Sequence, residues 1–199
     1  MPVGRTWITS GAVDGLTRLA LKAQAGDGES MRSFVGATYE QVWRLCAHLV
    51  DQSSADDLAQ ETFTRAVRAL PRFAAASSAR TWLWAIARHS CIDELRERDR
   101  RRRRDRSLRA MASVDRPAPD AGQEAVVADL LSRLEFERRN ALVLTQILGL
   151  SYEEAAGVCG CPVGTIRSRV ARARADLLAA LGGSGPGAFA KAGDEASLA

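Results

Sequence analysis

The sequence predicts an all-α protein made of two small helical domains joined by a flexible linker. Three observations carry this prediction. Apolar residues recur at the spacing of amphipathic helices along most of the chain, no segment alternates polar and apolar residues as a strand would, and a proline-containing stretch interrupts the helices. The chain has 199 residues, of which 46% are hydrophobic, which suffices for one ordinary domain or two small cores.

Composition places the boundaries of these domains. Pro117 and Pro119 oppose helix formation in a segment with few apolar residues, which predicts a linker. The segment after Gly182 reads Gly-Gly-Ser-Gly-Pro-Gly, a low-complexity composition that predicts disorder. The expected parts are a flexible N-terminus (1–15), a first helical domain (16–105), a linker (106–122), a second helical domain (123–182) and a disordered tail (183–199).

Four helices are expected in the first domain. The first starts near residue 16, and the second is expected to use Ser30 as its N-cap. The third starts near residues 53–54, has Val67 on its inward face and is ended by Pro71. The fourth starts near Ala79 and dissolves into an arginine run. Its expected buried stripe comprises Trp82, Leu83, Ile86, Cys91, Ile92 and Leu95.

Two apolar stripes predict two helices at the start of the second domain, and Gly149 closes the second of them. The first stripe comprises Val126, Val127, Leu130, Leu131 and Leu134. The second comprises Ala141, Leu142, Leu144, Thr145 and Leu148.

The segment from Ser151 to Leu178 has the pattern of a helix-turn-helix. Ala156 is the small residue that lets the helices meet, and Gly160 is the turn residue without a Cβ. Thr165 lies where backbone N–H groups and a hydroxyl can meet a phosphate. The alternative is a helical hairpin with a solvated basic face. The second helix is expected to bury Ile166, Val170, Ala173 and Leu177 and to expose Arg167, Ser168, Arg172 and Arg174.

A polar stripe lies on the third expected helix, opposite its apolar face. It comprises Asp57, Gln60, Glu61 and Thr64, at the spacing of one helical face. An acidic-to-neutral face in a protein of net charge +4 favours docking of a basic partner. A plain solvated face is the alternative.

Basic residues are concentrated in two places. Nine arginines and three acidic residues lie between Arg96 and Arg109, and a second cluster follows Arg167. Such clusters are typical of proteins that bind polyanions, although a solvated charged run is the alternative. Around Trp82 and Trp84, tryptophan alternates with arginine beside a loop, as stacking on unpaired bases requires, while each Trp taken singly is a core candidate.

Other functional classes find little support. The four cysteines are scattered, and the spacing of Cys159 and Cys161 differs from the C-x2-C of zinc sites, so we expect neither a disulfide framework nor a metal or cofactor. There is no glycine-rich phosphate loop, nucleophile elbow or histidine near paired carboxylates, so we expect no enzyme. No apolar run could span a bilayer and no signal peptide is evident, which predicts a cytoplasmic protein.

Three motifs in this order resemble the extracytoplasmic-function (group 4) sigma factors of RNA polymerase, in an actinobacterial-like form. The motifs are residues 54–63 (SADDLAQETF), 79–88 (ARTWLWAIAR) and 161–174 (CPVGTIRSRVARAR). The resemblance spans about residues 16–181. It implies a first domain that binds core polymerase and opens the −10 promoter element, and a helix-turn-helix domain that reads the −35 element.

The resemblance also implies partners and residue roles. The partners are the clamp helices of the largest polymerase subunit, the flap of the second-largest subunit, promoter DNA and, in some relatives, an anti-sigma factor, with no membrane. The implied clamp contacts are Asp57, Gln60 and Glu61. The implied −10 contacts are Phe73, Ser77, Ser78, Trp82, Arg88, His89 and Arg96, with residues 73–78 as the loop that captures a flipped base. The implied −35 contacts are Thr165, Arg167, Ser168, Arg169 and Arg172.

One departure concerns the −10 loop. Many relatives carry an amide or carboxylate side chain there, whereas this chain has Ala74-Ala75-Ala76-Ser77-Ser78. Backbone groups and the serines are therefore the candidate readers of the base, and an ordinary loop in which Ser78 only caps the next helix is the alternative. For the whole chain, the alternative function is a stand-alone helix-turn-helix regulator, which would leave the polar stripe and the Trp segment unexplained.

Overall fold

The computed structural model describes residues 14–108 and 123–181, and every regular element in these ranges is helical. The all-α prediction is therefore confirmed. The N-terminus up to residue 13, residues 109–122 of the expected linker and the tail from residue 182 lie outside the described residues. Helix α4 extends to Leu108, three residues into the range expected for the linker.

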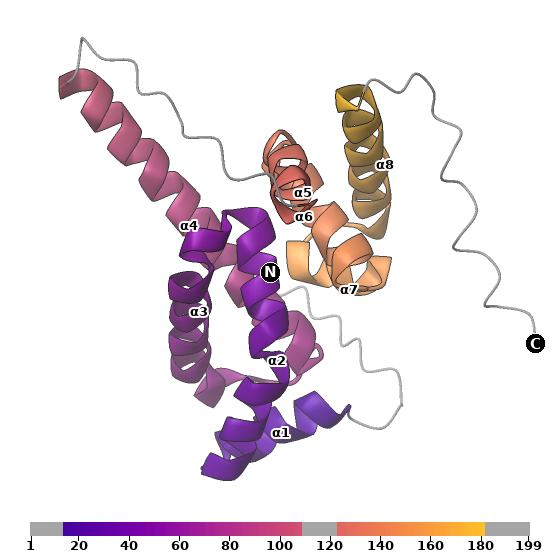
Figure 1. The fold of residues 1–199 in the computed structure, drawn as a ribbon. Coiled ribbons are helices and arrows are strands. Elements are labelled where there is room, and N and C mark those ends of the chain that lie inside the picture. The colour runs from indigo at the N-terminus through magenta and orange to yellow at the C-terminus, as the bar shows by residue number, and fades with distance from the viewer. Residues whose placement is uncertain (1–13, 109–122, 182–199) are drawn as a thin grey trace, which may run out of the picture.

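Four helices form the first domain, and they are α1 (Gly15–Gln24), α2 (Gly28–Leu49), α3 (Ala55–Ala69) and α4 (Ala79–Leu108). Single 3-10 turns, Gln52–Ser54 and Leu70–Arg72, lie at either end of α3. Helices α2 and α3 lie side by side, and the first half of α4 packs against both (Figure 1). The core of this domain includes Phe34, Val42, Leu45, Leu49, Leu58, Phe63, Leu83 and Trp84, all buried.

Five helical segments form the second domain. They are α5 (Gln123–Ser132), α6 (Phe136–Leu142), one π-helical turn (Val143–Ile147), α7 (Tyr152–Cys159) and α8 (Val163–Ala180). Ser151 caps α7 in a capping box with Glu154, and Gly160 turns the chain in the left-handed conformation with φ 63°. The helix-turn-helix prediction is confirmed in its turn and its buried residues Ile166, Val170 and Ala173, whereas Leu177 and Arg174 are half-buried.

Some details of the expected helices were wrong. Asp27, not Ser30, caps α2, and Ser30 is buried with its hydroxyl donating to the Asp27 carboxylate at 2.6 Å. Val67, expected on the inward face, is 50% exposed and lines a groove beside α2. Val126 and Val127 are likewise exposed, by 51% and 43%. A periodic apolar stripe does not by itself identify which of its members a neighbouring helix reaches.

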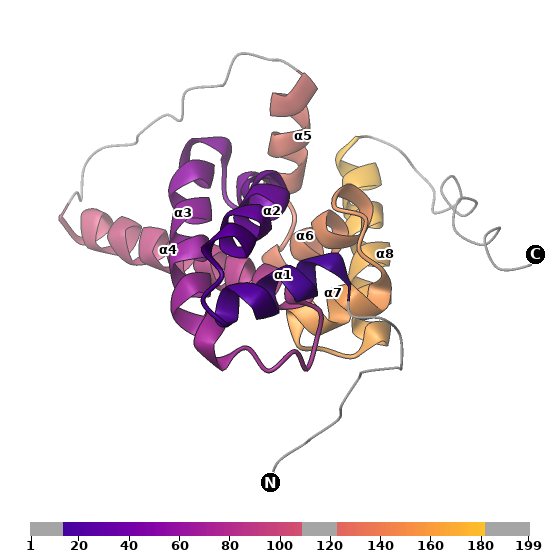
Figure 2. The same ribbon diagram turned by 90° about the horizontal axis from the view of Figure 1, so that it is seen from below.

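The two domains contact each other through α4 and α7 (Figures 1 and 2). Gly157 permits the close approach, because a Cβ there would lie 3.0 Å from the Thr81 methyl carbon. Hydrogen bonds cross the same boundary: the Arg139 guanidinium donates to the Leu49 carbonyl at 2.9 Å, and the Arg80 guanidinium donates to the Leu148 carbonyl at 3.1 Å. Arg80 also lies over the Trp84 ring, 5.4 Å from its centroid.

Candidate nucleic-acid interface

The polar stripe of α3 borders a shallow apolar groove. Asp57, Gln60 and Glu61 are all exposed, as expected. The Glu61 carboxylate forms an ion pair with the Arg65 guanidinium at 2.7 Å. Gln60 also lines the groove, which has a volume of about 620 Å³. The other lining residues are Val35, Tyr39, Asp56, Phe63, Thr64, Val67 and Arg68. Helices α2 and α3 therefore expose polar and apolar groups side by side on one surface.

Sequence reasoning missed the apolar part of this surface. Tyr39 is 40% exposed and stacks on Phe63 with ring centroids 5.9 Å apart. Its hydroxyl donates to the Asp56 carboxylate at 3.3 Å, and burial together with the Asp56 charge raises the pKa of Tyr39. Val67 is the second exposed apolar residue of the groove. In the sequence, Val67 belongs to the apolar stripe of α3, and nothing distinguishes it from the members of that stripe that are buried.

The loop between α3 and α4 is fixed at both ends and strained in the middle. The Gln24 amide donates to the Leu70 and Phe73 carbonyls at 2.9 and 3.0 Å, and the Ala79 amide donates to the Thr17 hydroxyl at 2.8 Å. Ala75 has φ 50°, a left-handed conformation that is uncommon for a residue with a Cβ. Such strain clusters at functional segments, where the surrounding structure holds it in place.

The side chains of this loop divide into a floor and an exposed rim. Phe73 is only 6% exposed and packs on Trp82 with ring centroids 4.9 Å apart. Ala74, Ala76 and Ser77 are exposed. The Ser78 hydroxyl accepts from the Thr81 amide at 3.1 Å, so Ser78 caps α4, a role that is compatible with both interpretations of the loop.

The remaining −10 candidates lie along α4 in different environments. His89 and Arg96 are exposed on the solvent side of the helix. Arg88 is 9% exposed and forms an ion pair with Glu137 of the second domain. Glu137 also lies 3.0 Å from Arg169, a −35 candidate. One carboxylate thus holds an arginine from each expected DNA-binding surface, a contact that no local pattern in the sequence indicated.

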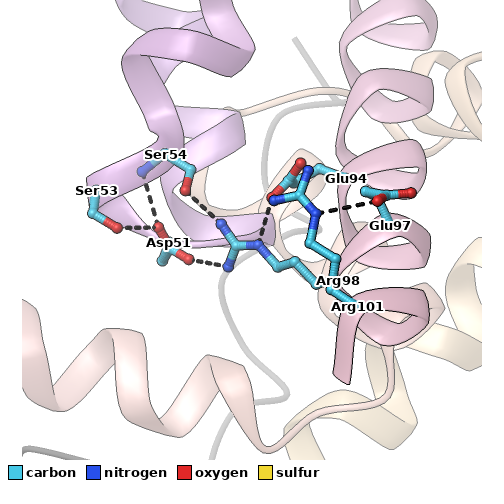
Figure 3. A network of polar contacts seen from close by, with 7 residues as sticks. All are labelled: Asp51, Ser53, Ser54, Glu94, Glu97, Arg98 and Arg101. Atoms are coloured by element: carbon cyan, nitrogen blue, oxygen red, sulfur yellow. Dashed lines mark hydrogen bonds and ion pairs between the residues drawn. The ribbon is translucent and has the colours of Figure 1, made fainter. Parts of the chain in front are cut away.

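Arg98 joins the middle of α4 to the turn between α2 and α3 (Figure 3). Its guanidinium binds the Asp51 carboxylate, the Ser54 hydroxyl and, at 2.6 Å, the Glu94 carboxylate. Asp51 in turn accepts from the Ser53 hydroxyl at 2.7 Å and the Ser54 amide at 2.9 Å. This network fixes the direction of α4 where the helix leaves the core.

The Asp51 network predicts a pH-dependent contribution to stability. Burial acts to raise the pKa of Asp51, but hydrogen bonds from Arg98, Ser53 and Ser54 outweigh it and lower that pKa from 3.8 to about 2. Since a lowered pKa means that folding favours the carboxylate, the contribution is complete above about pH 5 and is lost as the pH falls from about 4 to about 2. Partial exposure limits it to about 1 kcal/mol.

We therefore expect Asp51→Asn to lower the free energy of unfolding by about 1 kcal/mol at pH 7, measured by urea denaturation. The difference between variant and wild type should shrink as the pH approaches 3, because the unfolded wild-type carboxyl is then mostly protonated and folding no longer gains the full benefit of the bound carboxylate. A difference that stays constant from pH 7 to pH 3 would contradict this account of Asp51.

The second helix of the helix-turn-helix presents free cations to solvent. Arg167, Ser168 and Arg172 are exposed, and Thr165 is half-buried at the N-terminal end of α8. The ion pairs among the described residues include neither Arg167 nor Arg172. Unpaired guanidiniums on an exposed helix face are available to base edges and phosphates.

The cysteines are free thiols. Cys46 and Cys91 are buried in the first domain, and Cys159 and Cys161 are partly exposed. Burial raises the pKa of Cys159 to about 11, although Arg88 and Arg169 act in the opposite direction. The described ranges contain no group of three or more His, Cys, Asp or Glu side chains placed to hold a metal ion. No described helix has both the length and the apolar content needed to cross a membrane.

In comparisons with known proteins, both domains match regions of the same kind of protein. The families described as Sigma-70 region 2 and Sigma-70 region 4 match residues 34–101 and 125–177. The chain is 52% identical over 168 residues to the ECF RNA polymerase sigma factor SigC of Mycobacterium tuberculosis. The aligned region covers 83% of this chain and 91% of that relative.

Solved structures agree with this similarity. The structure of CnrH in complex with the cytosolic domain of CnrY has a TM-score of 0.68 and 29% identity, and covers 85% of this chain and 98% of that one. The sigma factor RpoE of Bartonella quintana, in complex with the anti-sigma factor NepR, has a TM-score of 0.65 and 28% identity, with 77% and 98% covered. The chain therefore belongs to the extracytoplasmic-function family of RNA polymerase sigma factors.

Proposed function

We propose that this sigma factor directs promoter-specific transcription initiation through three surfaces with separate tasks. The polar stripe of α3 and the adjoining groove bind the clamp helices of core RNA polymerase, the loop of residues 73–78 and the exposed side of α4 bind the −10 element, and α8 reads the −35 element. The observation that carries the proposal is that exposed, chemically distinct groups occupy all three surfaces of one chain. A stand-alone regulator would need only the last of them.

The individual residues follow from this division. Asp57, Gln60 and Glu61 are the proposed clamp contacts, and the apolar groove beside them receives apolar side chains of the same partner. At the −10 element, exposed Ser77, His89 and Arg96 are available directly, with Phe73 and Trp82 as the floor of the loop. Thr165, Arg167, Ser168 and Arg172 are the proposed −35 contacts.

The chain would supply binding and positioning, while the polymerase supplies the chemistry. We propose that it acts in the cytoplasm, where its polymerase and promoters are, without a cofactor of its own. The second-largest polymerase subunit, through its flap, is the expected partner of the second domain. Regulation by an anti-sigma factor is supported by the Bartonella quintana structure, in which a similar chain is bound by NepR.

Core polymerase binding tests the proposal. We expect the double variant Asp57→Lys and Glu61→Lys to bind cognate core polymerase at least about tenfold more weakly than wild type, and to lose promoter-dependent transcription in proportion. Reversing two charges that face a basic partner costs more than the loss of one exposed ion pair, which is worth about 1 kcal/mol or less. Core affinity is measured by fluorescence anisotropy, and folding by helical circular dichroism.

A matched control separates this face from net charge. The variant Glu29→Lys and Glu153→Lys makes the same change in charge, at an exposed acid paired within its own helix and at an acid in a first helical turn. We expect this control to bind core polymerase like wild type. Equal weakening by both variants, or unchanged affinity of the α3 variant with its helicity intact, would disprove the assignment of this face.

A further inference from the structure

Two of the four cysteines lie at the turn of the helix-turn-helix. Cys159 is the last residue of α7, Gly160 is the turn residue, and Cys161 directly precedes the N-cap of α8. Both thiols are free and partly exposed, whereas Cys46 and Cys91 are 0% exposed in the core of the first domain. An oxidant in solution therefore reaches the thiols of the turn more readily than those of the core.

The backbone of this turn places the two cysteines at the spacing of a disulfide. Gly160 has φ 63° and ψ 35°, close to the mirror image of a right-handed helical residue. A mirror image keeps all distances, so the Cα atoms on either side of Gly160 are about 5.5 Å apart, as residues i and i+2 of a helix are. Disulfides most often join Cα atoms about 5.5–6 Å apart. The turn therefore allows a bond between Cys159 and Cys161 once their side chains rotate toward each other.

Each sulfur of the turn accepts a hydrogen bond from another part of the second domain. The amide nitrogen of Asn140, a fully buried residue of α6, donates to the Cys159 sulfur at 3.1 Å. The Arg169 guanidinium of α8 donates to the Cys161 sulfur at 3.6 Å and also lies 3.0 Å from the Glu137 carboxylate. These hydrogen bonds help to fix the turn, and with it the direction of α8.

The surroundings of the two sulfurs assign them different roles in an oxidation. Burial raises the pKa of Cys159 to about 11, so this thiol keeps its proton at neutral pH. The Cys161 sulfur accepts from the cation of Arg169, which stabilises the negative charge that a sulfur carries when it attacks an oxidant. Cys161 is therefore the attacking sulfur, and Cys159 is the one that closes the disulfide.

We propose that Cys159 and Cys161 form a redox-active dithiol, which a hydroperoxide converts into a reversible disulfide that weakens reading of the −35 element. The effect on the −35 element rests on the proposed function of α8. Because the two side chains must rotate toward each other, their sulfurs leave Asn140 and Arg169, and the turn that directs α8 loses two contacts. Disulfides of cytoplasmic proteins are usually transient and catalytic or redox-sensing, which agrees with a reversible bond.

One hydroperoxide supplies the oxidation. The Cys161 sulfur gives up its proton, attacks the peroxide and breaks its O–O bond, which leaves a sulfenic acid on Cys161 and releases water or an alcohol. The Cys159 sulfur then displaces the sulfenic hydroxyl, which leaves as water together with the Cys159 proton, and the S–S bond forms. The two sulfurs together lose the two electrons that the peroxide gains. A thiol reductant reverses the reaction by exchange.

Mapping of the thiols in the full chain tests the chemistry. The reduced protein is treated with hydrogen peroxide, its remaining thiols are alkylated under denaturing conditions, and its peptides are identified by mass spectrometry. We expect a disulfide between Cys159 and Cys161 that dithiothreitol removes, while Cys46 and Cys91 remain alkylated as internal controls. Cys159→Ser should leave a sulfenic acid on Cys161 that dimedone traps, and Cys161→Ser should leave Cys159 reduced.

Promoter binding tests the consequence. The sigma factor is oxidised, freed of peroxide and assembled with untreated core polymerase, and its binding to a panel of −35 point variants is compared with that of the reduced protein. We expect discrimination to fall several-fold and to return with dithiothreitol, since one lost hydrogen bond typically changes an equilibrium about two- to tenfold. The double variant Cys159→Ser and Cys161→Ser should be insensitive to peroxide.

Any other pattern overturns the proposal. Four free thiols after peroxide treatment, a disulfide between Cys46 and Cys91, or bonds between chains would exclude the assigned pair. This mapping uses the wild-type protein, so it decides even if a serine variant fails to fold. A Cys159–Cys161 disulfide with unchanged discrimination would disprove the effect on α8. Failure of the proposed function would look different, because the reduced holoenzyme would then show no −35 preference at all.

Discussion

Arg167→Ala should cost the holoenzyme about 1–3 kcal/mol of discrimination at one base pair of the −35 element. Arg167 is exposed on α8, has no acidic neighbour in ion-pair range and follows directly after Ile166, which is fully buried and fixes the helix in the domain. A guanidinium held in this way can donate two hydrogen bonds to a guanine edge. The loss therefore should fall on one position and not on the whole site.

The measurement is competitive binding of holoenzyme to a panel of −35 point variants. Arg174→Ala is the matched control, because Arg174 lies on the same helix but its guanidinium donates to the Gln146 amide oxygen at 2.7 Å. We expect this control to keep the wild-type order of preference. If Arg167→Ala keeps that order too, Arg167 does not read a base.

Exchange of residues 74–78 for the corresponding loop of a relative should transfer the −10 preference of that relative. The loop is held at its ends by Gln24 and Thr17, while Ala74, Ala76 and Ser77 are exposed between them. Flipping a base out of the stack costs a few kcal/mol, so the loop must return a similar amount for the preferred base. The strained conformation of Ala75, together with the Phe73 floor, is consistent with a preformed pocket.

Permanganate footprinting of open complexes reports which −10 sequences the chimera melts. Its internal control is the −35 preference, which should not change because α8 is untouched. A second chimera exchanges residues 74–77 only and keeps Ser78, since Ser78 caps α4 and its loss would affect folding as well as recognition. A chimera that still melts only the original −10 sequence would rule out the loop as the reader of the base.

Features set by residues close in sequence, such as the turn of the helix-turn-helix, were predicted well. Features that depend on contacts between helices were predicted less well. Gly160 before α8 specifies a turn through residues close in sequence, and the structure confirms it. The capping box of Ser151 with Glu154 is equally local but was not predicted. The predicted N-cap of α2 was wrong because aspartate and serine are both favourable N-cap residues. The backbone conformation, which leaves the helix at Asp27, decides between Asp27 and Ser30. The inward position expected for Val67 was wrong, since this residue is 50% exposed at the rim of the groove between α2 and α3.

The candidate sites likewise combine features that the local sequence predicts with features that depend on tertiary contacts. The exposure of Asp57 and Arg167 follows from helical periodicity, which the sequence reveals. The left-handed Ala75 could not be foreseen, because alanine rarely adopts that conformation without the contacts that hold the loop. The position of Glu137 depends on how the two domains pack, and no sequence period spans a domain boundary.

We expect Glu137 to couple the binding of the two promoter elements, if Arg88 and Arg169 contact DNA as the family resemblance implies. Its carboxylate holds Arg88 of the first domain and Arg169 of the second, so either guanidinium must leave it before binding a phosphate or a base. Binding of the first promoter element then includes the free-energy cost of breaking the contact between the domains at Glu137. The second element binds a chain in which this contact is already broken. By reciprocity, each element should strengthen binding of the other by the same factor, even on DNA fragments that are not joined.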